Sequence, residues 1–160
     1  MKIYKKLYRT FFEQISSRSI IEKKISYTFK NKKYLKQAFT HKSIHNSPSH
    51  NYERLEFLGD SVLDLIISKE LMTEFPDGDE GLLTQKRASL VQKPYLASIG
   101  QLLNLMDYLK IEDNVNLKIN KIADKQLANL LEALIGAIYL DGGIKPCEKL
   151  ILSTVWSHRK

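Results

Sequence analysis

Three carboxylates stand at helical spacing between Asn51 and Leu63: Glu53, Glu56 and Asp60 are three and four residues apart. On one face of a helix such neighbours lie about 5–6 Å from each other and repel. The residues around them are apolar enough for a buried helix, namely Leu55, Phe57, Leu58, Val62, Leu63, Leu65 and Ile66. Because buried carboxylates need a compensating cation, the spacing predicts a divalent metal with oxygen ligands. The alternative, that the acids face water at the amino end of the helix, stays open, above all for Glu53.

A fourth carboxylate, Glu132, lies in the middle of a second apolar stretch. Long charged side chains are rarely buried without a partner. Asn129 lies one turn earlier on the same face of the predicted helix, where it can contribute an amide oxygen. A salt bridge from Glu132 to a lysine would also satisfy the carboxylate, and the sequence leaves both options open.

Both apolar helices carry small residues that permit close packing. Ala133, Gly136 and Ala137 give the second helix a small surface. Gly59 in the first costs roughly 1 kcal/mol relative to alanine inside a helix, which is tolerable where another group must approach the backbone. We therefore expect the two helices to pack face to face and their polar side chains to converge on one cation. The predicted ligands are Glu56, Asp60, Asn129 and Glu132.

The ligand types select a metal. A di-iron centre needs histidine three residues after glutamate, but Gly59 and Ile135 stand there. No histidine or cysteine is placed for zinc. Hard oxygen ligands favour Mg²⁺ or Mn²⁺, which suit phosphodiester hydrolysis because the ion generates hydroxide from water and stabilises charge on the leaving oxygen. Asp64, one further turn along, is expected not to be a ligand because it lies about 6 Å beyond Asp60 along the axis.

The composition is that of a globular protein in a reducing compartment. The 160 residues are 43 % apolar and 27 % charged, which is enough for a core. The lone Cys147 excludes an internal disulfide. The basic start lacks the apolar run of a secretory signal, and no stretch approaches a membrane span. We expect a cytoplasmic location and no membrane partner.

The net charge of +7 is spread unevenly. Residues 1–50 carry twelve Lys/Arg and two acids, whereas residues 51–80 carry two Lys/Arg and nine acids. A basic chain with one acidic block indicates a polyanionic partner and a metal site inside a basic field. A solvated basic surface kept for solubility is the alternative.

The periodicity predicts an all-α protein. We expect one or two helices between residues 4 and 29, a short helix at 34–40, the acidic helix at about 52–75, a helix capped by Thr84, and another opened by Lys93 and Pro94. Residues 107–124 are expected to be loop or short helices. The second long helix should run from about 124 to 140 and a last one from 145 to 160. His45 and His50 lie in a polar stretch of turn formers, where we expect an exposed loop rather than a metal site.

The segment Glu53-Arg-Leu-Glu-Phe-Leu-Gly-Asp60 resembles the signature of the ribonuclease III nuclease domain. Three more segments resemble that family in the right order: Phe39-Thr-His-Lys-Ser43, Asp79-Glu-Gly81 followed by Lys86-Arg-Ala88, and Leu131-Glu-Ala-Leu-Ile-Gly-Ala-Ile-Tyr-Leu-Asp141. The resemblance covers about residues 20–155. It implies one nuclease domain over 1–160, with a basic helix at 1–19 before the core.

The resemblance also implies a homodimer that cleaves double-stranded RNA with Mg²⁺, for which Mn²⁺ can substitute, and leaves 5′-phosphates and short 3′ overhangs. No small-molecule cofactor is implied. Glu56, Asp60 and Glu132 would be catalytic metal ligands, and Glu53 and Glu80 would line the same acidic valley and help to place the RNA. Phe57 would insert into a pocket of the partner subunit, although the sequence by itself favours an ordinary core phenylalanine there.

Two departures from the family pattern are evident. The family usually has aspartate where this chain has Asn129, and the amide removes one negative charge, which should weaken metal binding. The family also appends a double-stranded-RNA-binding domain, which we do not expect in this chain. The alternative function is therefore a catalytically weak or silent ribonuclease III-like module that binds RNA or has a structural role.

Overall fold

The computed structural model describes residues 20–112 and 120–159. The basic helix expected at residues 1–19 lies outside the described residues. The named elements are α2 (Lys32–Ala38), α3 (Glu53–Glu74), α4 (Glu80–Val91), α5 (Lys93–Leu102), the short 3₁₀ turn η1 (Leu105–Tyr108), α6 (Asn120–Gly142), α7 (Ile144–Ile151) and the π-helical turn η2 (Leu152–Trp156). The described part of the chain contains no strand, only one isolated bridge between Thr40 and Lys110, so the all-α prediction is confirmed.

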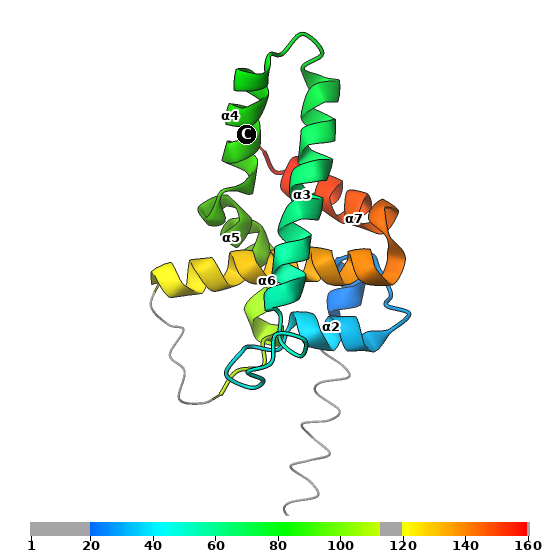
Figure 1. Ribbon diagram of the computed structural model, residues 1–160, viewed down its shortest axis with the longest axis vertical. Coiled ribbons are helices and arrows are strands. Elements are labelled where there is room, and N and C mark those ends of the chain that lie inside the picture. Colours follow the sequence, from blue (N-terminus) through cyan, green and yellow to red (C-terminus); the bar gives the residue numbers. More distant parts are fainter. Residues whose placement is uncertain (1–19, 113–119, 160) are drawn as a thin grey trace, which may run out of the picture.

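The two long helices α3 and α6 cross near the amino-terminal half of α3 (Figure 1). A Cβ placed on Gly136 would lie 2.1 Å from the carbonyl oxygen of Leu55, so only glycine permits this approach of the two backbones. Gly59 is equally tight against the backbone of Glu132. The predicted face-to-face packing of the two apolar helices is therefore present, and it brings the acidic stretch of α3 against the middle of α6.

The amino end of α3 is fixed by the buried Asn51. Its side-chain oxygen accepts a hydrogen bond from the Glu53 N–H at 2.9 Å, which satisfies one of the donors that a helix start leaves unpaired. Its amide nitrogen donates to the His45 carbonyl at 3.0 Å and so ties the preceding loop to the helix. The backbone that carries the first carboxylates of α3 is consequently fixed from the first turn.

The start of α4 differs from the prediction. Its cap is Asp79, whose side chain accepts from the Leu82 N–H at 2.8 Å, and not Thr84. Aspartate is the stronger capping residue, and Asp79 stands directly after the Pro76–Gly78 turn. Thr84 lies inside the helix, where its hydroxyl donates to the Glu80 carboxylate at 3.0 Å. Helix α4 therefore begins about one turn earlier than expected.

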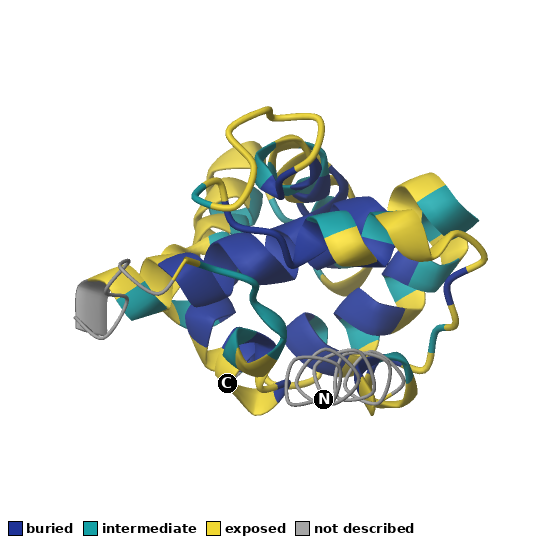
Figure 2. Cartoon of the chain, turned by 90° about the horizontal axis from the view of Figure 1, so that it is seen from below, coloured by how far each residue is buried: buried dark blue, intermediate teal, exposed yellow. Residues whose placement is uncertain are grey.

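Burial is greatest along α6, where every residue from 126 to 138 is buried. Figure 2 shows the buried residues gathered in the middle of the molecule and the exposed ones on its outer elements. Helix α5 packs on α6 through Gly100, where a Cβ would lie 2.9 Å from the Leu127 carbonyl oxygen. Because other helices cover the middle of α6, a carboxylate at that place is removed from water.

Several boundaries of the predicted helices were wrong by a few residues. Helix α6 begins at Asn120 rather than near 124, and the final helical segment ends at Trp156 rather than 160. The short helix α2 begins and ends two residues before the range that we predicted. Gly143, at a positive φ of 80°, separates α6 from α7 because that conformation favours glycine.

Candidate metal centre

One ammonium group lies where the sequence predicted a cation. The Nζ atom of Lys93 donates to Asn129 Oδ1 at 2.9 Å and to the two Glu132 carboxylate oxygens at 3.2 and 2.9 Å. It also lies 3.9 Å from Glu56 Oε1. Side chains from α3 and α6 thus face one positive charge, which comes from the first residue of α5. The salt bridge from Glu132 to a lysine, left open by the sequence, is present.

The electrostatics of Glu132 explain why a cation is needed. Only 3 % of its side chain is exposed, and this burial raises the pKa of the carboxyl from 4.5 to about 7. Lys93 opposes the shift, and the negative charges of Asp60 and Glu56 add to it. Burial likewise raises the pKa of Glu56, again against Lys93. One ammonium therefore only partly offsets the cost of gathering these acids.

Asn129 presents its amide oxygen to the ammonium, because a lysine can only donate. The residue is buried. An oxygen held in this direction is the atom that a hard cation would bind. The departure from the family pattern therefore keeps an oxygen at this place and changes only its charge.

The next two acids along α3, Asp60 and Asp64, are placed differently from Glu56. Asp60, one turn after Glu56, is exposed, and its charge acts on both Glu56 and Glu132. Asp64 has one buried carboxylate oxygen without a hydrogen-bond partner, and burial raises the pKa of this carboxyl while Arg87 opposes the shift. Neither Asp60 nor Asp64 contacts Lys93, and the exclusion of Asp64 from the ligand set stays a prediction.

The structure does not bring all the predicted acids of the chain together. Glu53 is half-buried at the start of α3 and lies 3.7 Å from Lys42 Nζ. Glu80 is the first residue of α4, which begins beside the carboxyl-terminal end of α3 (Figure 1), and it lines a cavity with Ser68, Leu71 and Met72. At 1.5 Å per residue, these residues lie roughly 20 Å along α3 from Glu56. Glu80 is thus not part of the cluster that Lys93 forms with Glu56, Asn129 and Glu132.

The residues of the cluster fit a hard cation in type, in charge and in burial, although not in their present positions. Within residues 20–112 and 120–159, no three His, Cys, Asp or Glu side chains are gathered closely enough to hold a metal ion as they lie. The nearly dry Glu132 carboxylate and the inward amide oxygen of Asn129 are ligands that a divalent ion satisfies better than one ammonium. Binding would require the exposed Asp60 and the half-buried Glu56 to turn inward.

Sequence reasoning missed Lys93, which it treated only as the opening of a helix. Lys93 is 39 residues from Glu132, so no local spacing connects them. The one available signal was a lysine at the start of a helix that packs on the second apolar helix. The sequence gives no direct indication of that packing.

Comparison with known protein families shows to which family the chain belongs. A family model described as ribonuclease-III-like matches residues 31–158. The chain belongs to the ribonuclease III family. It is 45 % identical to ribonuclease 3 of Campylobacter fetus over 140 residues, and 44 % identical to ribonuclease 3 of Ehrlichia canis over the same length.

These alignments cover 86 % of this chain but 60 % and 62 % of the two relatives, so the ribonuclease III chain spans about three-fifths of their length. Among solved structures, it is similar to the nuclease domain of ribonuclease III from Campylobacter jejuni, with a TM-score of 0.77 and 38 % identity over 86 % of this chain and 95 % of that one. That structure was described for flexibility in a region involved in dimer formation. Dicer from Pichia stipitis matches at a TM-score of 0.58 and 31 % identity, over 79 % of this chain and 56 % of that one.

Phe57 of this ribonuclease III chain is not a core residue. It is 78 % exposed, so the expectation from sequence pattern was wrong. Leu65, expected in the core, is 62 % exposed, and Met72 is 64 % exposed. These three residues lie within one side of α3, because 100° per residue places them less than a quarter turn apart. Helix α3 therefore exposes three apolar side chains on the side turned away from α6, with Arg54 and Ser61 between them, and we call this side its exposed apolar face.

A cavity of about 650 Å³ adjoins Phe57. Its lining comes from α2, the loop before α3, the first turns of α3 and the end of α6. The lining residues are Gln37, Ser49, Glu53, Arg54, Leu55, Phe57, Leu58 and Leu140. Exposed apolar surface and an open cavity thus lie together at the amino end of α3.

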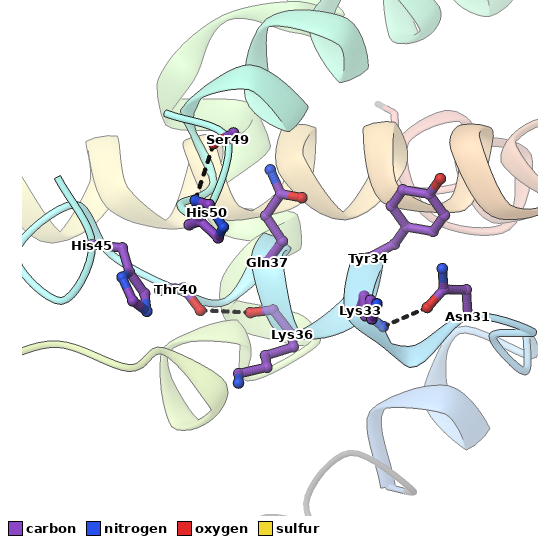
Figure 3. A pocket seen from close by; sticks show the side chains of 9 residues that line it. All are labelled: Asn31, Lys33, Tyr34, Lys36, Gln37, Thr40, His45, Ser49 and His50. Carbon is purple, nitrogen blue, oxygen red and sulfur yellow. Dashed lines mark hydrogen bonds between the residues drawn. The ribbon is translucent and has the colours of Figure 1, made fainter. Parts of the chain in front are cut away.

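A second cavity of about 500 Å³ lies between α2 and the loop that carries the two histidines (Figure 3). Its lining includes Lys33, Lys36, His45 and His50 and no acid. His50 Nδ1 and the Ser49 hydroxyl are 3.0 Å apart, and the loop is exposed as predicted. The cavity offers positive charge but no carboxylate that could hold a divalent ion for hydrolysis.

Among the described residues, no helix is long and apolar enough to cross a membrane.

Proposed function

We propose that this chain is the nuclease part of a metal-dependent endoribonuclease that cleaves double-stranded RNA as a homodimer. Membership of the ribonuclease III family supports the proposal. The observation that carries it is the convergence of Glu56, Asn129 and Glu132 on one cation between α3 and α6. An oxygen-only set around a buried carboxylate suits Mg²⁺, with Mn²⁺ as a substitute.

In this proposal Glu56, Asp60 and Glu132 supply three carboxylates and Asn129 one amide oxygen to the ion. When bound, the ion supplies activation of water and stabilisation of charge on the leaving oxygen. Glu132 would give up its proton to hold the ion, since its pKa of about 7 keeps it partly protonated at neutral pH without the ion. The close packing of α3 on α6 fixes the backbones of these residues, which keeps their spacing suited to one geometry of the phosphodiester.

The homodimer is supported by the exposed apolar face of α3. Phe57 of one subunit would enter the 650 Å³ cavity of the other, and a two-fold axis makes the exchange reciprocal. Each subunit would cut one strand. Attack of water on phosphorus with the 3′ oxygen as the leaving group would leave a 5′-phosphate and a 3′-hydroxyl, and two centres offset along the duplex would leave short 3′ overhangs.

The remaining acids and the basic residues would place the RNA. Glu53 lies at the rim near Phe57. Glu80 is too distant to act at the centre of its own protomer, so it would line the valley only next to the partner subunit's centre. The basic cavity of Lys33 and Lys36 would receive backbone phosphates. Such binding is sensitive to salt and reads duplex shape rather than bases.

A second candidate function follows from Asn129 and Lys93. An amide in place of a carboxylate and an ammonium in the cation position both lower the negative charge available to a metal. The chain would then bind duplex RNA without cleaving it. This silent module predicts no products at any concentration of Mg²⁺ or Mn²⁺.

The test is incubation of the protein with long duplex RNA and Mg²⁺, with Glu132→Ala beside the wild type. The proposal predicts cleavage by the wild type and at least a 100-fold slower reaction for the variant, since loss of one group that stabilises charge in an active site commonly costs 10²–10³ in rate. Glu148→Ala is the matched control, because Glu148 is a carboxylate on α7 that pairs with Lys69 at 2.7 Å. Equal cleavage by the wild type and Glu132→Ala would reject the assigned site.

A further inference from the structure

The Lys93 ammonium satisfies oxygens that the proposed function assigns to a metal. An ammonium has three N–H donors. Here they face Asn129 Oδ1 and both oxygens of Glu132 within 3.2 Å, with Glu56 Oε1 at 3.9 Å. Three of the four predicted metal ligands thus already surround a cation. Only Asp60 has no contact with it.

The position of Lys93 is set by the fold. It is the first residue of α5, and Pro94 follows it, which fixes the backbone direction at the helix start. Two turns later Gly100 lies against the Leu127 backbone, and Leu96 between them is buried. Because α5 is seated on α6 in this way, the base of the Lys93 side chain stays beside Asn129 and Glu132.

We infer that Lys93 is an internal counter-ion that holds the cation position while no metal is bound and is displaced when a divalent ion binds. The inference rests on the proposed function, because it takes the metal to bind at these same ligands. It assigns to Lys93 a regulatory role: the strength of its contacts sets the concentration of free metal at which the centre fills. Lys93 is a competitor of the metal and not a ligand.

The Lys93 ammonium has room to move away from the site. The Lys93 side chain is 45 % exposed, so its flexible stem can move the ammonium into water without unfolding α5. The Glu132 side chain is 3 % exposed and has no such freedom. When one site can hold either cation, the mobile one leaves and the buried carboxylate stays.

The experiment is a calorimetric titration of the protein with Mn²⁺ alone, at pH 8, for the wild type and Lys93→Met. Methionine keeps the length of the stem and removes the charge. The inference predicts a dissociation constant for Mn²⁺ that is roughly 10- to 100-fold lower in Lys93→Met, since this is the range expected for removing hydrogen bonds between charged groups. It also predicts that saturating Mn²⁺ raises the melting temperature of Lys93→Met more than that of the wild type.

Lys125→Met is the matched control. Lys125 is exposed on α6, one turn before Asn129, and its charge also acts on Glu56. It makes none of the three Lys93 hydrogen bonds. If Lys93 acts by occupying the position, Lys125→Met tightens Mn²⁺ binding much less than Lys93→Met. An equal gain in both variants would overturn the inference and leave only a general effect of the basic field.

Glu132→Gln distinguishes a failure of the proposed role of Lys93 from a failure of the metal centre. Suppose that Glu132→Gln weakens Mn²⁺ binding, while the wild type and Lys93→Met bind Mn²⁺ equally. That result would overturn the role of Lys93 and leave the proposed function standing. Mn²⁺ binding that is indifferent to Glu132→Gln, or absent from both the wild type and Lys93→Met, would contradict the metal centre itself. Weaker binding by Lys93→Met would also overturn the inference.

Discussion

Gly59 of α3 lies directly against the backbone of Glu132 in α6, where a Cβ on Gly59 would be 1.7 Å from the Glu132 carbonyl oxygen. The contact couples packing to the site. It seats α3 on the segment of α6 that carries Glu132, and Glu56 is one turn before Gly59. The same close approach that forms the core therefore places the two carboxylates on either side of one cation.

Gly59→Ala should destabilise the protein. The added methyl group has no space against backbone, so the helices must separate, at a cost of about 1–3 kcal/mol or more in the free energy of unfolding. Equilibrium denaturation in urea measures the change. Gly81→Ala is the control, because a Cβ there would meet only the Asp79 side chain at 3.5 Å, and alanine is the better helix former. Equal stability of Gly59→Ala and the wild type would show that the helices do not pack as described.

The stability of the metal-free protein should fall as pH rises from about 4.5 to about 7. The pKa of Glu132 is about 7 in the folded protein and 4.5 as an ordinary value. Between them the folded protein binds one more proton than the unfolded chain, so the free energy of unfolding decreases with pH. Denaturation in a chelating buffer at several pH values measures this slope. Glu132→Gln should lose that part of the decrease, and an unchanged slope would contradict the raised pKa.

Phe57→Ala should weaken self-association. In the proposed dimer the lost ring would leave the partner's cavity empty, and removing a central aromatic side chain from an interface commonly costs about 2 kcal/mol or more. Sedimentation equilibrium measures the monomer–dimer constant. Leu102→Ala, which truncates a 55 % exposed side chain at the end of α5, should leave that constant unchanged. A dimer of equal strength in Phe57→Ala would exclude this face.

Asn129→Asp should tighten divalent metal binding by roughly 10-fold, because carboxylate ligands raise the affinity of a hard-cation site. Titration with Mn²⁺ provides the measurement. Lys125→Met changes the local charge by the same amount without adding a ligand, so it should have a smaller effect. Affinity that is unchanged in Asn129→Asp would mean that residue 129 does not contact the ion.

The sequence predicted those features that depend on one helix at a time. The limits of α3 were correct to within one residue because Pro76 ends it and an apolar period runs throughout. Gly59 and Gly136 could each be recognised as a packing position because glycine inside a helix needs a packing reason. Both depend on local physical preferences that operate before the chain has folded.

Other features depend on how helices meet. Lys93 contacts Glu132, which is 39 residues away in the sequence, and this contact depends on how α5 packs on α6. Phe57 follows the same pattern of apolar residues as the core, and nothing in that pattern indicates which side of α3 is left uncovered. Glu80 was grouped with Glu56 by resemblance, although most of the length of α3 separates them within the chain. Such relationships arise from tertiary packing and not from spacing.

The central claim is that carboxylates of α3 and α6 share one divalent ion. Crystals soaked in Mn²⁺ and examined by anomalous diffraction test it most directly. The account predicts one strong peak between α3 and α6, about 2.0–2.2 Å from oxygens of Glu56, Asp60, Asn129 and Glu132, with the Lys93 ammonium withdrawn into water. A peak elsewhere, or a saturated crystal in which Lys93 still contacts Glu132 and no peak lies between the helices, would contradict it.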